Sequence, residues 1–104
     1  MPILKFSGIS EKRVEEYSKK INEIAQLVVA DPANIMFIAE GSKIFPEQGK
    51  QTPIYVTVEW MARPDKEQLL TNHLVEFFKE DSEKVSVFFT EINGKFYVKG
   101  NKVG

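Results

Sequence analysis

The order strand, helix, strand occurs twice in this sequence, with a long loop between the two copies. The four apolar runs that read as strands lie at 3–6, 35–39, 54–61 and 85–90. Helical patterns fill the gaps at about 10–30 and from Pro64 onward. Because a strand–helix–strand crossover is right-handed, both helices are expected on one face of a shared sheet. The sequence therefore predicts an α+β fold, a four-stranded mixed sheet with two helices on one face.

The two helical patterns differ in how they begin and end. In the first, Ser10 is placed to be the N-cap, and Asp31-Pro32 ends the helix because proline disfavours helix in the residue before it. In the second, Asp65 is predicted to cap the helix, with Gln68 completing a capping box. The apolar positions predicted to face the core are Val14, Tyr17, Ile21, Ile24, Ala25 and Val28, then Leu70, Leu74, Phe77 and Phe78.

The two halves also resemble each other in sequence. Pro2-Ile3 recurs as Pro53-Ile54 at an offset of 51 residues, which predicts a pseudo-repeat of 2–40 and 53–91. Asn93-Gly94 lies between apolar runs and predicts a C-terminal hairpin, with 96–98 folding back on the fourth strand. With 104 residues, the chain has room for a single domain, 1–104.

Composition removes several classes of function. Without cysteine there are no disulfides and no cysteine-bound metals, and the one histidine, His73, is placed as a partly exposed helix residue; we expect no cofactor and no metal. Fourteen basic residues against fifteen acidic ones predict no nucleic-acid partner. No apolar run is long enough to cross a membrane, and the N-terminus lacks a signal-peptide pattern, so a cytoplasmic protein is expected.

Pro2 is the first candidate catalytic residue. If Met1 is removed, as a small second residue permits, the Pro2 nitrogen becomes a secondary amine. A free α-amino group titrates near about 8, and an apolar pocket lowers that pKa further, which makes a base at neutral pH. The alternative is a proline that merely tolerates the start of a strand.

The order of elements fits two folds, the ferredoxin-like sandwich and the tautomerase fold. The strands are apolar on both faces, as at 36–38 and 88–89, which favours association of several chains. Met-Pro at the head of this arrangement, together with Pro2–Phe6, Val58–Trp60 and Val87–Thr90, resembles the tautomerase superfamily that includes 4-oxalocrotonate tautomerase and macrophage migration inhibitory factor (MIF), and most closely an uncharacterised bacterial family within it.

The resemblance implies a homotrimer with an N-terminal proline in a pocket at each subunit boundary. There the proline would move a proton in keto–enol tautomerisation, or hydrate an unsaturated acid, on a small carboxylate. Only Pro2 matches the superfamily's functional residues. Ile9 and Ile35 stand where 4-oxalocrotonate tautomerase-like members have arginines, Ala30-Asp31 where the inhibitory-factor branch has a lysine, and Ser86 where it has a pocket tyrosine.

Three residues are candidates to hold the substrate in place of the missing arginines. Arg63 follows the third strand and its planar guanidinium suits a carboxylate, Lys43 lies in the long loop, and Tyr97 lies in the terminal hairpin, where it could reach a neighbour's pocket. The alternatives are a solvated Arg63 beside acidic residues, a solvated loop lysine and an edge-strand tyrosine.

Four further charged positions allow both functional and ordinary interpretations. Glu40 and Glu91 end equivalent strands and could divide acid and base roles, or be solvated. Lys5 lies between apolar neighbours and either points toward an oligomer axis or extends to solvent, and Glu59 needs a partner if its strand face is covered.

Three functions remain open from sequence. The first is a tautomerase or isomerase that uses Pro2. The second is a non-catalytic trimeric binding protein of the same fold, and the third is a ferredoxin-like domain that binds a small molecule.

Overall fold

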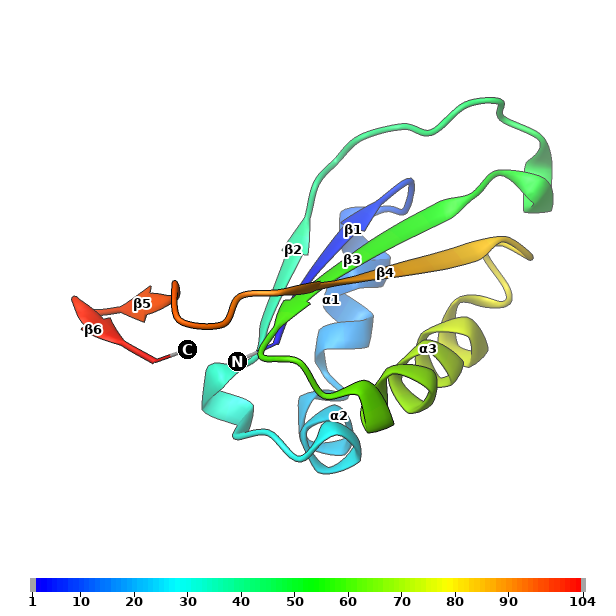
Figure 1. Cartoon of the computed structure of the whole chain (residues 1–104). Helices are drawn as coiled ribbons and strands as arrows, with labels where there is room; N and C mark the ends of the chain where they lie inside the picture. The colour runs from blue at the N-terminus through cyan, green and yellow to red at the C-terminus, as the bar shows by residue number, and fades with distance from the viewer. Residues whose placement is uncertain (1, 104) are drawn as a thin grey trace.

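The computed structural model describes residues 2–103, and these form one sheet, a helical layer and a C-terminal ribbon (Figure 1). The strands are β1 (Ile3–Ser7), β2 (Met36–Ala39), β3 (Ile54–Trp60), β4 (Val85–Glu91), β5 (Tyr97–Val98) and β6 (Asn101–Lys102). The α-helices are α1 (Glu11–Ser18), α2 (Ile21–Val28) and α3 (Pro64–Phe78), and 3₁₀ turns occupy Pro32–Asn34 and Gly49–Gln51. The expected removal of Met1 concerns a residue outside the described part.

The main sheet has the order β2-β1-β3-β4. β1 is parallel to β2, β3 is parallel to β4, and the two central strands β1 and β3 are antiparallel. This confirms the predicted four-stranded mixed sheet, with α1, α2 and α3 on one face (Figure 1). In a ferredoxin-like domain another strand separates the two parallel strands of each unit. Here they pair directly, which excludes that alternative.

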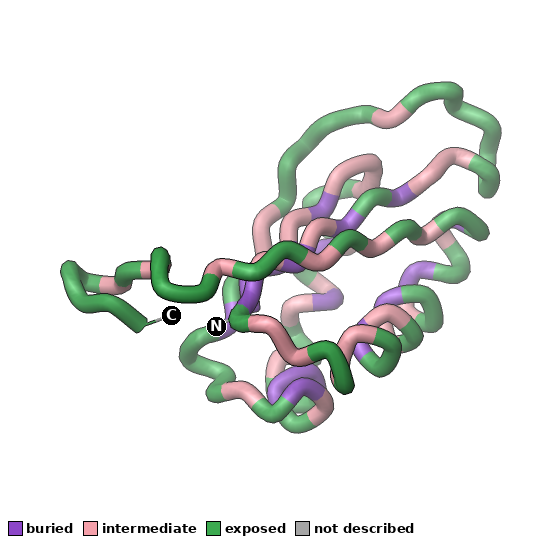
Figure 2. Tube along the Cα trace, viewed as in Figure 1, coloured by how far each residue is buried: buried purple, intermediate pink, exposed green. Residues whose placement is uncertain are grey.

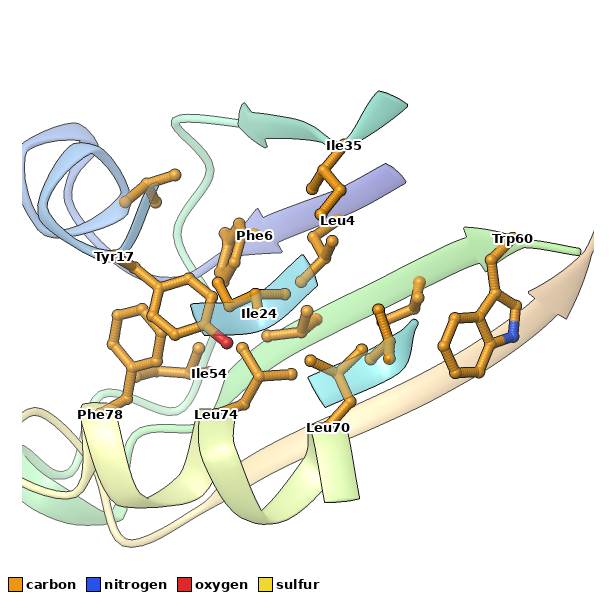
Figure 3. Packing of buried hydrophobic residues seen from close by; sticks show 14 of the residues in the cluster. Leu4, Phe6, Tyr17, Ile24, Ile35, Ile54, Trp60, Leu70, Leu74 and Phe78 are labelled. Atoms are coloured by element: carbon orange, nitrogen blue, oxygen red, sulfur yellow. The ribbon is translucent and has the colours of Figure 1, made fainter. Parts of the chain in front are cut away.

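The core lies between the sheet and the helices. Leu4 and Phe6 from β1 and alternate residues of β3 from Ile54 to Trp60 are buried, as the alternating pattern predicts (Figure 2). Leu70, Leu74 and Phe78 of α3 complete this layer, whose buried side chains are drawn in Figure 3.

The single helix predicted over 10–30 is two helices. α1 ends at Ser18 in a tight turn, in which the Lys19 and Lys20 amides donate to carbonyls three residues back, and α2 restarts at Ile21. The Ser18 hydroxyl donates to the Glu15 carbonyl at 2.6 Å, a back-bond that bends helices. The Ser10 side chain caps α1 as predicted.

The predicted cap of the second helix was wrong. Arg63 is the N-cap residue of α3 and Pro64 is its first residue, so Asp65 lies inside the first turn. The Gln68 side chain donates to Asn72 rather than completing a capping box.

The C-terminal hairpin exists, but its turn and partner differ from those predicted. β5 pairs with β6, not with β4, and the two-residue loop is Lys99-Gly100, with φ of 53° and 83°. Asn93-Gly94 forms a turn that redirects the chain out of β4. The C-terminal ribbon, formed by β5 and β6, projects past the end of the main sheet (Figure 1). The molecule is 43 Å long but only 24 and 23 Å across.

Gly8 fixes the turn between β1 and α1, which gives a stability prediction. Its φ is +84°, and a Cβ there would lie 2.8 Å from the Pro53 carbonyl oxygen. We expect Gly8→Ala to lower the free energy of unfolding by about 2–4 kcal/mol. Gly41→Ala is the control, because Gly41 also has positive φ but no atom within 4 Å of the added Cβ, and should cost about 1 kcal/mol. Equal costs in urea unfolding would contradict the steric explanation.

Candidate active site at the head of the first strand

Pro2 lies buried at the head of β1. Its carbonyl accepts a hydrogen bond from the Met36 amide at 3.0 Å, which fixes it to the start of β2. Because Ile3 pairs with Glu59, the end of β3 lies beside Pro2 on the other side. The strand ladders therefore hold residue 2 between the start of β2 and the end of β3.

Apolar aromatic side chains lie at this end of the core. Trp60, the last residue of β3, is 1% exposed and lies at the far end of the core cluster in Figure 3. Its ring centroid is 5.0 Å from that of Phe89, with the ring planes 30° apart. Since Leu4 and Phe6 face the helices, alternation places Pro2 on the same side of the sheet as Trp60. The helix-facing side of this end of the sheet therefore offers Pro2 apolar surroundings.

Arg63 lies three residues beyond β3, at the same end. One guanidinium nitrogen, Nη1, donates to the carbonyl of Val28 at 3.2 Å, at the C-terminal end of α2. The nearby acidic residue Asp65 does not bind the Arg63 guanidinium, because Asp65 pairs with Lys66 instead. A guanidinium has five N–H donors, so Arg63 can tie α3 to α2 and still offer donors to an anion.

Tyr97 also belongs to this end of the sheet. β4 ends beside Trp60, and the Ile92 amide donates to the Trp60 carbonyl at 2.9 Å before the chain leaves for the ribbon. Tyr97 is 60% exposed on the projecting ribbon. Tyr97 therefore lies beyond the end of its own sheet and away from Pro2 of the same chain.

Lys43 lies at the opposite end of the sheet from Pro2. β1 and β2 are parallel, so the loop after β2 emerges where β1 ends rather than where it begins. Lys43 pairs with Glu47 at 3.5 Å and lines a cavity of about 380 Å³ with Gly8, Ser10 and Glu11. Within one chain, Lys43 and Pro2 therefore lie at opposite ends of the sheet and do not share a site.

The two strand-terminal glutamates are also separated. The antiparallel β1–β3 pair reverses the direction of the second half, so Glu40 follows β2 at one end of the sheet and Glu91 ends β4 at the other. They cannot divide acid and base roles in one subunit. Only Glu91 lies at the Pro2 end, next to Trp60 in the strand register.

Sequence reasoning missed a polar cluster that joins the three helices. The Tyr17 hydroxyl of α1 and His73 Nδ1 of α3 are 2.9 Å apart, and His73 Nε2 bonds the Glu23 carboxylate of α2. Tyr17 is fully buried, and burial raises the pKa of its hydroxyl. The signal in the sequence was a tyrosine and a histidine, each beside an apolar helical stripe.

This cluster predicts how stability depends on pH. The hydrogen bond from His73 holds the Glu23 pKa below its usual 4.5. A carboxyl with a lowered pKa in the folded state stabilises the fold above its unfolded pKa, and this contribution is lost as pH falls through the folded value. We expect the melting temperature to fall as pH drops below 4.5, less steeply in Glu23→Gln. Glu15→Gln, an exposed change on α1, should keep the wild-type slope, and equal slopes in all three proteins would contradict the assignment.

Two classes of site are absent from the described residues. Within 2–103, no three His, Asp or Glu side chains come close enough together to hold a metal ion. None of the helices in that range is both long and apolar enough to cross a membrane.

Comparison with solved structures identifies the fold. A protein of unknown function from Sebaldella termitidis matches with a TM-score of 0.80 at 19% identity, covering 96% of this chain and 97% of that one. Leishmania major MIF2 matches with a TM-score of 0.74 at 18% identity, covering 97% and 96%. A MIF homologue from Prochlorococcus marinus matches with a TM-score of 0.75 at 11% identity, covering 99% and 98%. The chain therefore has the MIF/tautomerase fold.

Sequence comparison defines the family. A search of curated protein sequences finds no match. The family model described as "Domain of unknown function (DUF1904)" matches residues 1–103, and the Sebaldella termitidis structure carries the same domain. Since this match spans nearly the whole chain, the protein belongs to the DUF1904 family.

Proposed function

We propose that this protein is a tautomerase-like enzyme that moves a proton on a small carboxylate substrate, with Pro2 as the base. The observation that carries the proposal is the buried position of Pro2 at the head of β1, in a MIF/tautomerase fold. Loss of Met1 would leave Pro2 with a free secondary amine. The apolar surroundings at Trp60 and Phe89 would favour the neutral form of that amine, which is the form that accepts a proton.

The proposed reaction is an internal proton transfer. Neutral Pro2 nitrogen takes the proton from the enol oxygen or from the carbon beside the carbonyl. The electron pair shifts along the enolate, and the protonated amine returns the proton to the other position. Nothing is oxidised or reduced, and the amine ends in its starting state.

Substrate binding in this proposal needs a cation and a second copy of the chain. Arg63 is the candidate that would bind the carboxylate, because it follows β3 at the Pro2 end of the sheet and has further N–H donors. Tyr97 would come from the ribbon of a neighbouring subunit in a homotrimer. One protein of similar fold, Pt0534, is described as inactivated by 2-oxo-3-pentynoate, which is itself a small 2-oxo acid. A 2-oxo or 2-hydroxy-dienoic acid is therefore the substrate class to test first.

A non-catalytic trimeric binding protein is the second candidate. What favours it is the set of residues that differ from the tautomerase pattern: Ile9, Ile35 and Ser86 carry no positive charge or phenol. In that case Pro2 would serve only to start β1, and the protein would bind small carboxylates without turning them over.

Two measurements test the proposal. Light scattering should give the mass of three chains, and a monomer or dimer would contradict the trimer. Protein without Met1 should ketonise phenylenolpyruvate or 2-hydroxydienoates faster than buffer, whereas protein that retains Met1 should not, because its Pro2 nitrogen is an amide. Equal rates in the two forms would exclude Pro2 as the base and favour the binding role.

A further inference from the structure

The sheet face opposite the helices carries a mixture of residues that is unusual for a surface in water. By strand alternation and register, the side chains on this face are Ile3, Lys5, Ser7, Met36, Ile38, Tyr55, Thr57, Glu59, Ser86, Phe88 and Thr90. Three of its large side chains are open, since Met36 is 47%, Tyr55 is 41% and Phe88 is 56% exposed, whereas Ile3 is 6% exposed. The helices lie on the other side, and the ribbon projects past the end of the sheet (Figure 1).

Only two strand residues on this face are charged, and they bind each other. Lys5 Nζ lies 3.4 Å from Glu59 Oε1, across the two central strands β1 and β3. Lys5 is opposite Thr57 and Glu59 is opposite Ile3, so the pair is diagonal and is surrounded by apolar and hydroxyl side chains. The two side chains remain 34% and 32% exposed in the single chain.

We infer that the Lys5–Glu59 pair lies within the contact between copies of this chain and determines how their sheet faces pack. The inference rests on the assembly in the proposed function and adds to it the residues that specify the contact. The face is neutral overall, so it does not select a strongly charged partner. A second copy fits this face instead, because its own Lys5 and Glu59 offer an opposite charge to each member of the pair.

The C-terminal ribbon gives a second reason to expect another copy of the chain on the open sheet face. It leaves β4 at the sheet's end and carries Tyr97 and Val103, which are 60% and 44% exposed, away from its own core. A second copy placed against the open face can receive this ribbon as well. Each chain would thus offer both an uncovered sheet face and an unsupported ribbon.

An ion pair exposed to water and one buried in an interface contribute differently to association, and this difference makes the inference testable. An exposed ion pair contributes little, so losing one partner on a wet face should change the association constant by less than about fivefold. Removing one partner from a covered pair leaves an unpaired buried charge, and should weaken assembly at least about 100-fold. Replacing both partners with apolar side chains of similar length should restore assembly to within about tenfold.

The experiment is a cycle of four proteins: wild type, Lys5→Met, Glu59→Met and the double variant. Association constants come from sedimentation velocity over a range of concentrations, and circular dichroism checks that each chain is folded. Lys12→Met is the matched control, because Lys12 is exposed on α1, away from the sheet. We expect both single variants to dissociate, while the double variant and the control assemble.

Other outcomes overturn the inference in distinguishable ways. Folded single variants that assemble like wild type would show that the Lys5–Glu59 pair remains exposed to solvent in the assembly. Loss of assembly in the double variant would show that side-chain shape, not an unpaired charge, was responsible. A wild-type protein that is monomeric at every concentration would overturn the assembly in the proposed function as well, whereas the first two results leave that assembly standing.

Discussion

Replacing Tyr17 with alanine is expected to lower the free energy of unfolding by about 3–5 kcal/mol, the usual cost of removing a buried aromatic ring. Tyr17 is fully buried at the centre of an aromatic cluster. Its ring centroid lies between 5.0 and 5.9 Å from those of Phe6, Phe37, Phe77 and Phe78. Alanine would leave a cavity where α1, α3 and the sheet meet. Urea unfolding at one fixed protein concentration measures the loss.

Two further variants separate the stability contributed by the buried ring from that of its hydroxyl and from that of an exposed ring. Tyr17→Phe keeps the ring and removes only the hydrogen bond to His73, so it should cost about 1 kcal/mol. Phe45→Ala removes an aromatic ring that is 72% exposed, and should change stability by less than about 0.5 kcal/mol. If Tyr17→Ala cost no more than Phe45→Ala, the helical layer would not depend on this cluster.

Replacing Pro2 with alanine is expected to lower the rate of proton transfer by at least about tenfold and by no more than the 10²–10⁴-fold that a positioned base contributes. Alanine also permits removal of Met1, so an amine remains at residue 2. That primary amine lacks the ring that fixes the nitrogen's direction at the head of β1. The rate of enol acid ketonisation under substrate-saturating and dilute conditions measures the effect.

The pseudo-repeat supplies the matched control for this change. Pro53 precedes β3 as Pro2 precedes β1, at the predicted offset of 51 residues. Pro53→Ala should keep most of the proton-transfer rate, because Pro53 lies at the other end of the sheet. If both substitutions reduced the rate equally, the loss would come from the strands and not from a base at residue 2.

The helical period and the strand alternation of apolar residues predicted most of the fold correctly. The alternation from Ile54 to Trp60 placed β3 and its buried face, and the stripe of Leu70, Leu74 and Phe78 placed α3 against it. These patterns record burial directly, because each buried position must be apolar along a fixed period. Apolar residues on both strand faces also indicated that the sheet face away from the helices is unusual, as Met36 and Phe88 show.

Local hydrogen bonds and pairing partners were harder to predict. A helical period continues through Lys19 and Lys20, and only the Ser18 back-bond and the tight turn break it. Asn93-Gly94 is a strong turn signal, but turn residues do not say which strand will pair afterward. The hairpin formed instead at Lys99-Gly100.

The candidate site was predictable only in part, because strand direction decides which loop residues meet. Pro2, Arg63 and the start of the Tyr97 ribbon share one end of the sheet, since β3 runs back toward the head of β1. Lys43 lies at the other end because β2 runs parallel to β1. Direction depends on pairing between distant segments, which single-residue patterns do not contain.

The central claim is that residue 2 presents a reactive secondary amine. Labelling with 2-oxo-3-pentynoate is the most direct test of it. The compound's alkyne would be attacked by that nitrogen, forming a carbon–nitrogen bond whose position is read by intact and peptide mass spectrometry. We predict one adduct per chain, on Pro2, in protein that lacks Met1, and none in protein that retains it. Contradiction would come from protein beginning at Pro2 that stays unlabelled or is labelled elsewhere.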